Sequence, residues 1–534
     1  MNKLILLFLS IFLSLGSIAQ TTNRYMVFFT DKNNNPYSIN QPQNYLSAKA
    51  ISREGRAIND EDLPVTPDYL STLITNDATI IGTSKWMNGA LITLLDTDVS
   101  IINSLSFVQQ VEYIAPGAQP PVVGGRYSSE DQESEDEELS ATLAQQNMLN
   151  SDIMRQDGYL GKGLLVAVLD GGFRGVDQGA YFSHLYANQQ IMDIHNFVTS
   201  GEDVYNYSDH GTRVFSTISA LGTDYDGIAT ESNFLLYVTE DVNSEYRIEE
   251  YNWLMAAERA DSAGVDIITT SLGYSDFDDA SMDYTHDDLD GKTAVITIAA
   301  EKAYEKGIIV VASAGNSGNK AWEKVTPPAD GEHVICVGSV DEFEMKSNFS
   351  SIGPINANWI KPDLMAMGER AVVIGQSGIT TSSGTSFATP QVAGLIAGLK
   401  GKYPNITNAA LIDIIKNSAD RAGNPDNSYG YGIPSYQAFE NFYETGTQSA
   451  FLNVYPNPIL DDGLMQVKVS DPNAINELGL VIYTTDGKKI FETSKSISWQ
   501  NNPVLVDLNV LSKGVYIARI ITTEQIVTKR IIKQ

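Results

Sequence analysis

Cysteine and histidine are scarce in this chain, and their scarcity limits the chemistry open to it. Cys336 is the single cysteine among 534 residues, so the chain cannot form an internal disulfide. Its place in the apolar run HVICVGSV is typical of a buried strand, which argues against a cysteine nucleophile. Four of the five histidines stand in contexts that indicate surface positions: His184, His195, His286 and His333. His210 is left as the candidate base.

Basic residues are also in the minority. The chain holds 35 Lys and Arg against 66 Asp and Glu, which gives a formal net charge of −31. Nucleic-acid binding needs a basic surface, so this composition excludes a nucleic-acid partner. An acid excess of this kind favours the solubility of an exported protein.

Long apolar runs are confined to the N-terminus. The segment MNKLILLFLSIFLSLGSIAQ places a lysine before an apolar stretch and ends on the small residues Ser17 and Ala19, which predicts a secretory signal peptide over residues 1–19. A membrane anchor is the alternative, and the shortness of the run argues against it. No later segment has eighteen uninterrupted apolar residues, so we expect a mature protein that does not span a membrane.

Composition divides the remaining chain into four segments. Residues 20–115 read as a small α+β unit. Residues 116–144 combine PGAQPPVVGG with the acidic run EDQESEDEE, which is typical of a flexible linker. Residues 145–443 alternate strand and helix patterns, and residues 450–534 carry short alternating strands that predict a β-sandwich of about seven strands.

The third segment predicts a three-layer α/β domain. Apolar strand-like runs recur along it, at residues 164–170, 233–239, 265–272, 307–315 and 333–340. Helical stretches such as RIEEYNWLMAAERADSAG and AVITIAAEKAYEKG lie between them. Apolar strands that alternate with helices indicate a parallel sheet with helices on both faces. Sites in such sheets form at the carboxyl ends of the strands.

Four polar residues of this domain stand at strand ends or helix starts. Asp170 ends a strand in VLDGGF, and Asn316 follows another in SAGNSG. His210 and Ser386 open helical stretches in DHGTRVFSTIS and GTSFATPQVAG. Each has a structural alternative as a turn or helix-cap residue. Together they supply the nucleophile, the base, the carboxylate that orients the base, and an amide donor for an oxyanion.

These motifs resemble those of the subtilisin-type serine peptidases, the S8 or subtilase family. VLDGGF resembles the aspartate motif of that family, DHGT the histidine motif, ASAGN the oxyanion motif and GTSFATPQVAG the serine motif. The order Asp, His, Ser is also that of subtilisin. TTSLG and SNFSSIGP extend the resemblance, which covers about 300 residues.

The resemblance implies a role for each group. Ser386 would attack the peptide carbonyl, His210 would carry the proton, and Asp170 would orient the imidazole. Asn316 would bind the oxyanion. The helix behind Ser386 would add a positive dipole, with Pro390 in its first turn, where the amides have no helical partner.

The resemblance also implies the walls of the substrate cleft. Ser271, Leu272 and Gly273 would form one wall, and Ala314 and Gly315 would belong to the other. Neither wall segment carries a charge. We therefore expect an apolar residue at P1, the substrate residue whose carbonyl is attacked.

The flanking segments resemble parts of a secreted precursor. Residues 20–115 have the position of an inhibitory propeptide that assists folding, and we expect cleavage between about Pro116 and Ala141. Residues 450–534, with VYPNP and KGVYIARI, resemble the sorting domain of the type IX secretion system of Bacteroidetes. The expected partners are protein or peptide substrates and the type IX machinery. We expect a monomer that passes through the periplasm and is secreted or held at the cell surface.

Two positions depart from the family pattern. Gly171 stands where Ser or Thr is usual and is expected to weaken a hydrogen bond near the aspartate. Phe215, in the stretch after His210-Gly211-Thr212, stands where smaller residues are usual, and we expect it to alter the packing behind His210. Both positions favour the alternative of a catalytically impaired subtilase-fold surface binding protein. A dedicated processing peptidase with one protein substrate is a third interpretation.

An acidic loop, DFDDASMDYTHDDLDG at residues 276–291, holds seven aspartates. Aligning Gly291 with the glycine of an EF-hand places His286 and Thr297 at ligand positions, so the loop is not that motif. The favoured interpretation is a solvated loop that caps the following helix, with calcium as the alternative. We expect no required cofactor.

Overall fold

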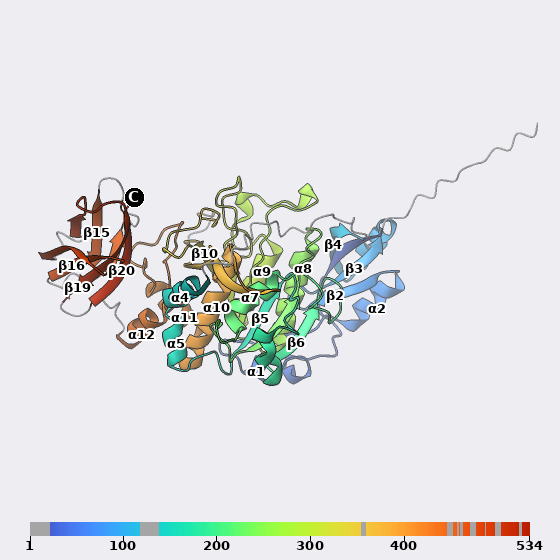
Figure 1. Cartoon of the computed structure of the whole chain (residues 1–534). Coiled ribbons are helices and arrows are strands. Elements are labelled where there is room, and N and C mark those ends of the chain that lie inside the picture. The colour runs from blue at the N-terminus through green and yellow to red at the C-terminus, as the bar shows by residue number, and fades with distance from the viewer. Residues whose placement is uncertain are drawn as a thin grey trace, which may run out of the picture.

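Three folded parts follow one another along the chain in the computed structural model (Figure 1). The structure describes residues 22–117, 138–353 and 359–445, and residues 452–533 apart from short gaps. The predicted signal peptide 1–19 and most of the linker 116–144, and with it most of the expected cleavage interval, therefore lie outside the described residues. In Figure 1 the N-terminal domain (blue) and the C-terminal domain (red) lie at opposite ends of the central domain.

The N-terminal domain is a four-stranded antiparallel sheet in the order β2-β3-β1-β4. Its elements are β1 (Thr22–Phe29), α1 (Ala48–Ser52), α2 (Pro67–Thr75), β2 (Thr79–Ser84), β3 (Gly89–Leu95), α3 (Val99–Asn103) and β4 (Val108–Pro116). Strand alternation buries both faces of the sheet. Tyr25, Val27 and Phe29 pack into the domain's own core, whereas Met26 joins a core shared with the central domain.

The segment YLSAKAISREGRAI is helical in composition but is mostly not helical in the structure. Only α1 (Ala48–Ser52) forms, with Ser47 as its N-cap and an extended Arg53 as its C-cap. The basic side chains that follow, Arg53 and Arg56, reach acidic groups of the central domain instead. Tertiary ionic contacts here override the helical composition of the segment.

The central domain is built on a seven-stranded parallel sheet in the order β11-β10-β9-β8-β5-β7-β6. The strands are β5 (Leu165–Asp170), β6 (Ile191–Asn196), β7 (Asn233–Val238), β8 (Ile267–Thr270), β9 (Ile309–Ser313), β10 (Ile335–Val340) and β11 (Leu364–Met367). The predicted α/β class and parallel sheet are confirmed, and β5 lies inside the sheet, between β8 and β7.

Helices cover both faces of this sheet. The main ones are α4 (Glu138–Leu149), α7 (His210–Ser219), α8 (Ile248–Ala263), α9 (Val295–Glu305), α10 (Thr385–Lys402) and α11 (Asn408–Asn417). Val166 and Val168 of β5 pack into the core that contains α7 and α10. Leu165, Ala167 and Leu169 pack into the core that contains α8 and α9. The N-terminal sheet extends this second core, beside α8 and α9 in Figure 1.

The C-terminal domain consists of two antiparallel sheets around one core. The described strands are β14 (Leu452–Tyr455), β15 (Leu464–Val469), β16 (Glu477–Thr484), β17 (Lys489–Ser496), β18 (Val504–Asp507), β19 (Gly514–Ile521) and β20 (Ile526–Lys533). One sheet has the order β14-β15-β18 and the other β17-β16-β19-β20. Inward side chains of both sheets, such as Val467, Leu480 and Ala518, share the core.

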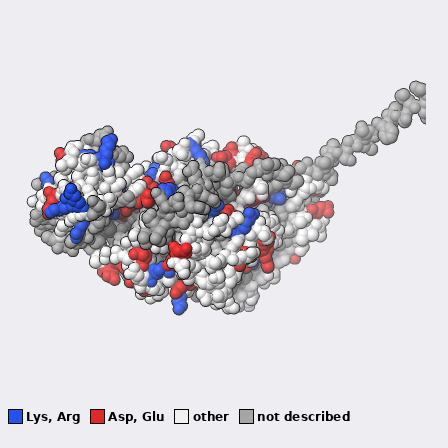
Figure 2. All heavy atoms as spheres, viewed as in Figure 1, with Lys and Arg blue, Asp and Glu red and all other residues white. Residues whose placement is uncertain are grey.

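Charge is unevenly divided between the domains. Residues 450–534 hold nine Lys and Arg against eight Asp and Glu, so the whole acid excess belongs to the rest of the chain. Figure 2 shows basic side chains gathered on the C-terminal domain and mixed charges over the central one. None of the described helices is both long enough and apolar enough to cross a bilayer.

Candidate active site

The four predicted catalytic groups stand at one edge of the central sheet, where its strands end. Asp170 is the last residue of β5, and Asn316 follows the end of β9. His210 is the first residue of α7, and Ser386 is the second residue of α10. Parallel strands bring their carboxyl ends to a common edge, which explains why residues so far apart in the sequence meet here.

Asp170 and His210 form a direct pair. The Nδ1 atom of His210 lies 2.8 Å from Oδ1 of Asp170, and the carboxyl group is fully buried. The backbone amide of Gly171 donates to the same Oδ1 at 2.7 Å. The second oxygen, Oδ2, is buried and accepts no hydrogen bond from any described residue. Gly171 has no side-chain hydroxyl to donate to it, which agrees with the weaker hydrogen bonding expected at this position.

Ser386 lies at the positive end of a long helix. Gly384 is the N-cap of α10, so Ser386 is a first-turn residue and does not cap the helix. The expectation for Pro390 is wrong, because it is the sixth residue of the helix and not part of the first turn. Proline removes the amide that would bond to the Ser386 carbonyl. The hydroxyl of Ser271 donates to that carbonyl instead, at 2.9 Å.

The side-chain amide of Asn316 is held by Thr385. The Asn316 Oδ1 atom accepts from the Thr385 amide at 2.9 Å and from its hydroxyl at 3.0 Å. With the oxygen occupied in this way, the Nδ2 donor is left to face the cleft. Thr385 stands inside the serine motif, which is the one sequence signal that marks its position.

A cleft of about 310 Å³ joins these groups to the predicted walls. His210, Ser386, Asn316, Ser271, Leu272, Gly273 and Gly315 all line it. Ala314 does not line it, because its side chain is fully buried in the core behind the wall. Four charged residues outside the predicted walls also line the cleft: Glu240, Glu245, Asp276 and Lys320.

Phe215 packs away from the catalytic pair, on the core side of α7. Its ring is fully buried and contacts the rings of Phe173, Phe182 and Phe234, with centroid distances of 6.4, 5.7 and 4.9 Å. The ring that contacts the His210 imidazole is that of Phe387, at 5.8 Å. The larger side chain at position 215 is therefore accommodated by an aromatic cluster.

The acidic loop uses its carboxylates on its own backbone. Asp279, Asp283 and Asp288 accept from the amides of Ser281, Phe277 and Thr285, at 3.0, 2.7 and 2.7 Å. Helix α9 begins with Ala294 as its N-cap and has no side-chain cap, so the expectation that the loop caps this helix is wrong. Within the described ranges, no three or more His, Cys, Asp or Glu residues are grouped so that they could hold a metal ion.

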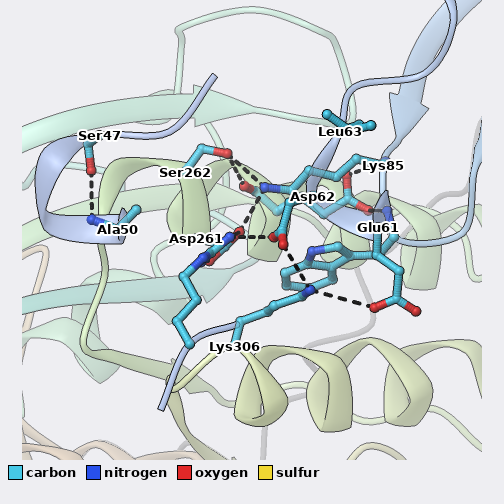
Figure 3. A network of polar contacts seen from close by, with 12 residues as sticks. Ser47, Ala50, Glu61, Asp62, Leu63, Lys85, Asp261, Ser262 and Lys306 are labelled. Atoms are coloured by element: carbon cyan, nitrogen blue, oxygen red, sulfur yellow. Dashed lines mark hydrogen bonds and ion pairs between the residues drawn. The ribbon is translucent and has the colours of Figure 1, made fainter. Parts of the chain in front are cut away.

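A buried ionic network joins the N-terminal domain to α8 (Figure 3). Asp261 is fully buried, and three cations of the N-terminal domain contact its carboxylate: Arg53 at 2.8 Å, Lys85 at 2.7 Å, and Arg56. Burial raises the pKa of this carboxyl, but Lys85 and the two arginines lower it more, so its pKa lies well below the ordinary value.

Further ionic contacts surround Asp261 and its three cations. Lys306 of the central domain lies 3.3 Å from Asp62, and Lys302 lies 2.7 Å from Glu61. Glu258 accepts from the amides of Lys85 and Trp86 at 2.8 and 3.0 Å, and from Ser84 at 2.6 Å. Burial raises the pKa of Glu258, against the effect of Lys85. The interface thus combines a shared apolar core with buried, hydrogen-bonded charges.

Comparison with protein families identifies all three parts of the chain. Residues 161–432 match the model of the subtilase family of S8 peptidases. Residues 24–131 match the S8 peptidase propeptide domain of Bacteroidota. Residues 453–534 match the secretion system C-terminal sorting domain. The chain is therefore a secreted precursor, destined for the medium or the cell surface.

Two subtilisins agree with the family match. Subtilisin DY of Bacillus licheniformis is 30% identical over 295 residues, which are 54% of this chain and 96% of that protein. Subtilisin E of Bacillus subtilis (strain 168) is 31% identical over 296 residues, 55% of this chain and 69% of that protein. A crystal structure of MycP1 from the ESX-1 type VII secretion system has 21% identity and a TM-score of 0.44, over 60% of this chain and 88% of that one. The chain belongs to the subtilase family of serine-type endopeptidases.

Proposed function

We propose that the central domain hydrolyses peptide bonds with Asp170, His210 and Ser386 as a catalytic triad. The observation that carries this proposal is the meeting of four matched groups at one edge of the sheet. His210, paired with the buried Asp170, lines a single cleft together with Ser386 and Asn316. An impaired binding module would have no need to keep this complete set.

Each step of the reaction has a group to perform it. His210 takes the Ser386 proton as the oxygen attacks the carbonyl, and Asp170 stabilises the resulting imidazolium. The Asn316 side-chain amide and the Ser386 backbone amide donate to the oxyanion. His210 then protonates the leaving amine, and water hydrolyses the acyl-enzyme by the reverse route. Every proton is carried by these residues, so the proposal includes no cofactor.

A fluorophosphonate probe tests this function directly. We expect the mature protein to be labelled covalently and Ser386→Ala not to be labelled. A folded wild-type protein that stays unlabelled would support the binding-module alternative. A labelled protein that cleaves one protein but no member of a peptide library would support the dedicated processing peptidase.

We propose that the N-terminal domain keeps the precursor inactive and holds to the peptidase through the network around Asp261. All three cations that contact Asp261 belong to the N-terminal domain, whereas Asp261 belongs to α8. Docking therefore neutralises a carboxylate that would otherwise be hydrated. Removing one partner from such a buried, hydrogen-bonded pair leaves the others uncompensated.

Asp261→Asn should weaken the hold of the propeptide. The substitution keeps the side-chain shape but removes the charge, which should cost about 2 kcal/mol or more and raise the inhibition constant of added propeptide by about 30-fold or more. Asp261 does not line the cleft, so the activity of the mature variant should match that of the wild type. Asp226→Asn is the matched control, since Asp226 pairs with Arg155 of the central domain. An unchanged inhibition constant in Asp261→Asn would contradict the docking role.

We propose that the type IX machinery binds the C-terminal domain. Its strands enclose a core of their own, so the domain should be removable without opening the catalytic core. A chain that ends at Ser449 should hydrolyse peptides normally and accumulate in the periplasm. If it reached the medium as efficiently as the full chain, the sorting role would be wrong. Loss of protein cleavage with normal peptide cleavage would indicate a substrate-binding domain instead.

A further inference from the structure

Thr326 bridges the two walls of the substrate cleft. Its backbone amide donates to the carbonyl of Ala314 at 3.3 Å, behind one wall. The carbonyl of the next residue, Pro327, accepts from the amide of Tyr274 at 3.1 Å, behind the other wall. The segment is thus hydrogen-bonded to the chain on both sides of the cleft, and the position of Thr326 between the walls is set by main-chain contacts.

The side chain of Thr326 fills the space between two glycines that line the walls. A Cβ atom added to Gly273 would lie 2.2 Å from the Thr326 Oγ1, and one added to Gly315 would lie 3.0 Å from it. The wall at Gly273 therefore approaches this side chain more closely than a residue with a Cβ would allow, and the wall at Gly315 leaves only a tight contact for one. Thr326 itself lines the cleft and is only 6% exposed, as expected for a group at the bottom of a slot.

The attacked carbonyl determines which substrate residue enters this slot. With the carbonyl carbon at the Ser386 oxygen and the oxyanion toward Asn316, the side chain of that same substrate residue, P1, would enter the cleft between the chain segments at the ends of β8 and β9. Ser271 and Gly273 of the first segment and Ser313 and Gly315 of the second line the cleft. The slot between them ends at Thr326.

We propose that Thr326 closes the P1 slot and restricts the peptidase to substrates with a small P1 residue, such as glycine, alanine or serine. The proposal rests on the serine-peptidase function proposed above. It replaces the expectation of an apolar P1 residue, which considered only the absence of charge in the walls, with a limit on the size of that residue. Thr326 is a specificity-determining residue and takes no part in proton transfer.

Removing the side chain should open the slot, and a substitution of equal size should not. Thr326→Gly is expected to raise kcat/KM for substrates with phenylalanine or leucine at P1 by about tenfold or more, the usual range for a few methylenes in a pocket. Thr326→Val is the matched control, because valine keeps the volume and lacks only the hydroxyl. That hydroxyl has no hydrogen-bond partner in the described structure, so its loss should leave the fold intact.

The test is a set of peptides that differ only at P1, assayed with wild type, Thr326→Gly and Thr326→Val. The wild type and Thr326→Val should cleave after alanine and serine at least tenfold better than after phenylalanine, and Thr326→Gly should lose or reverse this ranking. Fluorophosphonate labelling of each variant verifies an intact Ser386 site, and Thr326→Ala replaces the glycine variant if the latter does not fold.

The possible failures are distinguishable. A wild type that prefers phenylalanine, or a folded Thr326→Gly with an unchanged ranking, overturns the role of Thr326 and leaves the peptidase function standing. A wild type that cleaves no peptide and takes no label overturns the proposed function itself.

Discussion

Replacing Ser386 with alanine should lower kcat for peptide hydrolysis by about 10⁶-fold, the size of the loss when the same serine is removed from the relative subtilisin. Ser386 supplies the oxygen that forms the acyl-enzyme, and no neighbouring group can take its place. His210→Ala should lose about as much, because the two residues act as one unit. Asp170→Asn should also lose most activity, since an amide favours the wrong imidazole tautomer.

The measurement is steady-state hydrolysis of a chromogenic peptide, with circular dichroism to verify the fold. Ser183→Ala is a suitable control, because Ser183 is an exposed serine of the same domain whose hydroxyl donates only to the nearby Ala180 carbonyl. Activity within tenfold of the wild type in Ser386→Ala or His210→Ala would refute the triad. Near-normal turnover in Asp170→Asn would mean that another acid orients His210.

Asn316→Ala should lower kcat by about 10²–10³-fold with little change in KM, the loss seen in subtilisin when the corresponding donor is removed. The Nδ2 group is needed when negative charge develops on the carbonyl oxygen, so its loss affects the transition state more than substrate binding.

Thr385→Val should also lower kcat, but by less than Asn316→Ala. It removes one of the two hydrogen bonds that hold the Asn316 Oδ1, at 3.0 Å, and leaves the amide at 2.9 Å in place.

The test is to measure kcat and KM separately for Asn316→Ala and Thr385→Val. A lower kcat in both variants, with KM within a few-fold of the wild type, supports oxyanion binding by Asn316 and its positioning by Thr385. If Asn316→Ala instead raised KM and left kcat unchanged, Asn316 would be a substrate-binding residue only.

The sheet could be predicted from the sequence where its strands are buried on both faces. The five interior strands read as apolar runs, because helices cover them above and below. The two edge strands were missed for opposite reasons. Strand β6, IMDIHN, carries polar and partly exposed residues, while β11, LMAM, has only four residues and no pattern long enough to recognise.

The site was predictable to the extent that its residues stand at strand ends and helix starts. Asp170, His210, Asn316 and Ser386 each carry such a local signal, and their roles remain predictions. Contacts between distant segments leave no such signal. Nothing local to Thr326 indicates that its side chain meets Gly273, and nothing in SREGRAI indicates that its arginines surround a carboxylate on α8.

The proline in the serine helix has a mechanical consequence. Because Pro390 leaves the Ser386 carbonyl without a helical donor, that carbonyl is free to accept the hydroxyl of Ser271 at 2.9 Å. The Ser386 hydroxyl in turn contacts the Ser271 carbonyl at 3.4 Å. Ser271 of the cleft wall and the nucleophile Ser386 are thus connected by two contacts, each between the hydroxyl of one residue and the carbonyl of the other. A thermal displacement of the wall would carry the nucleophile with it, so the attack distance should vary less than the position of either residue.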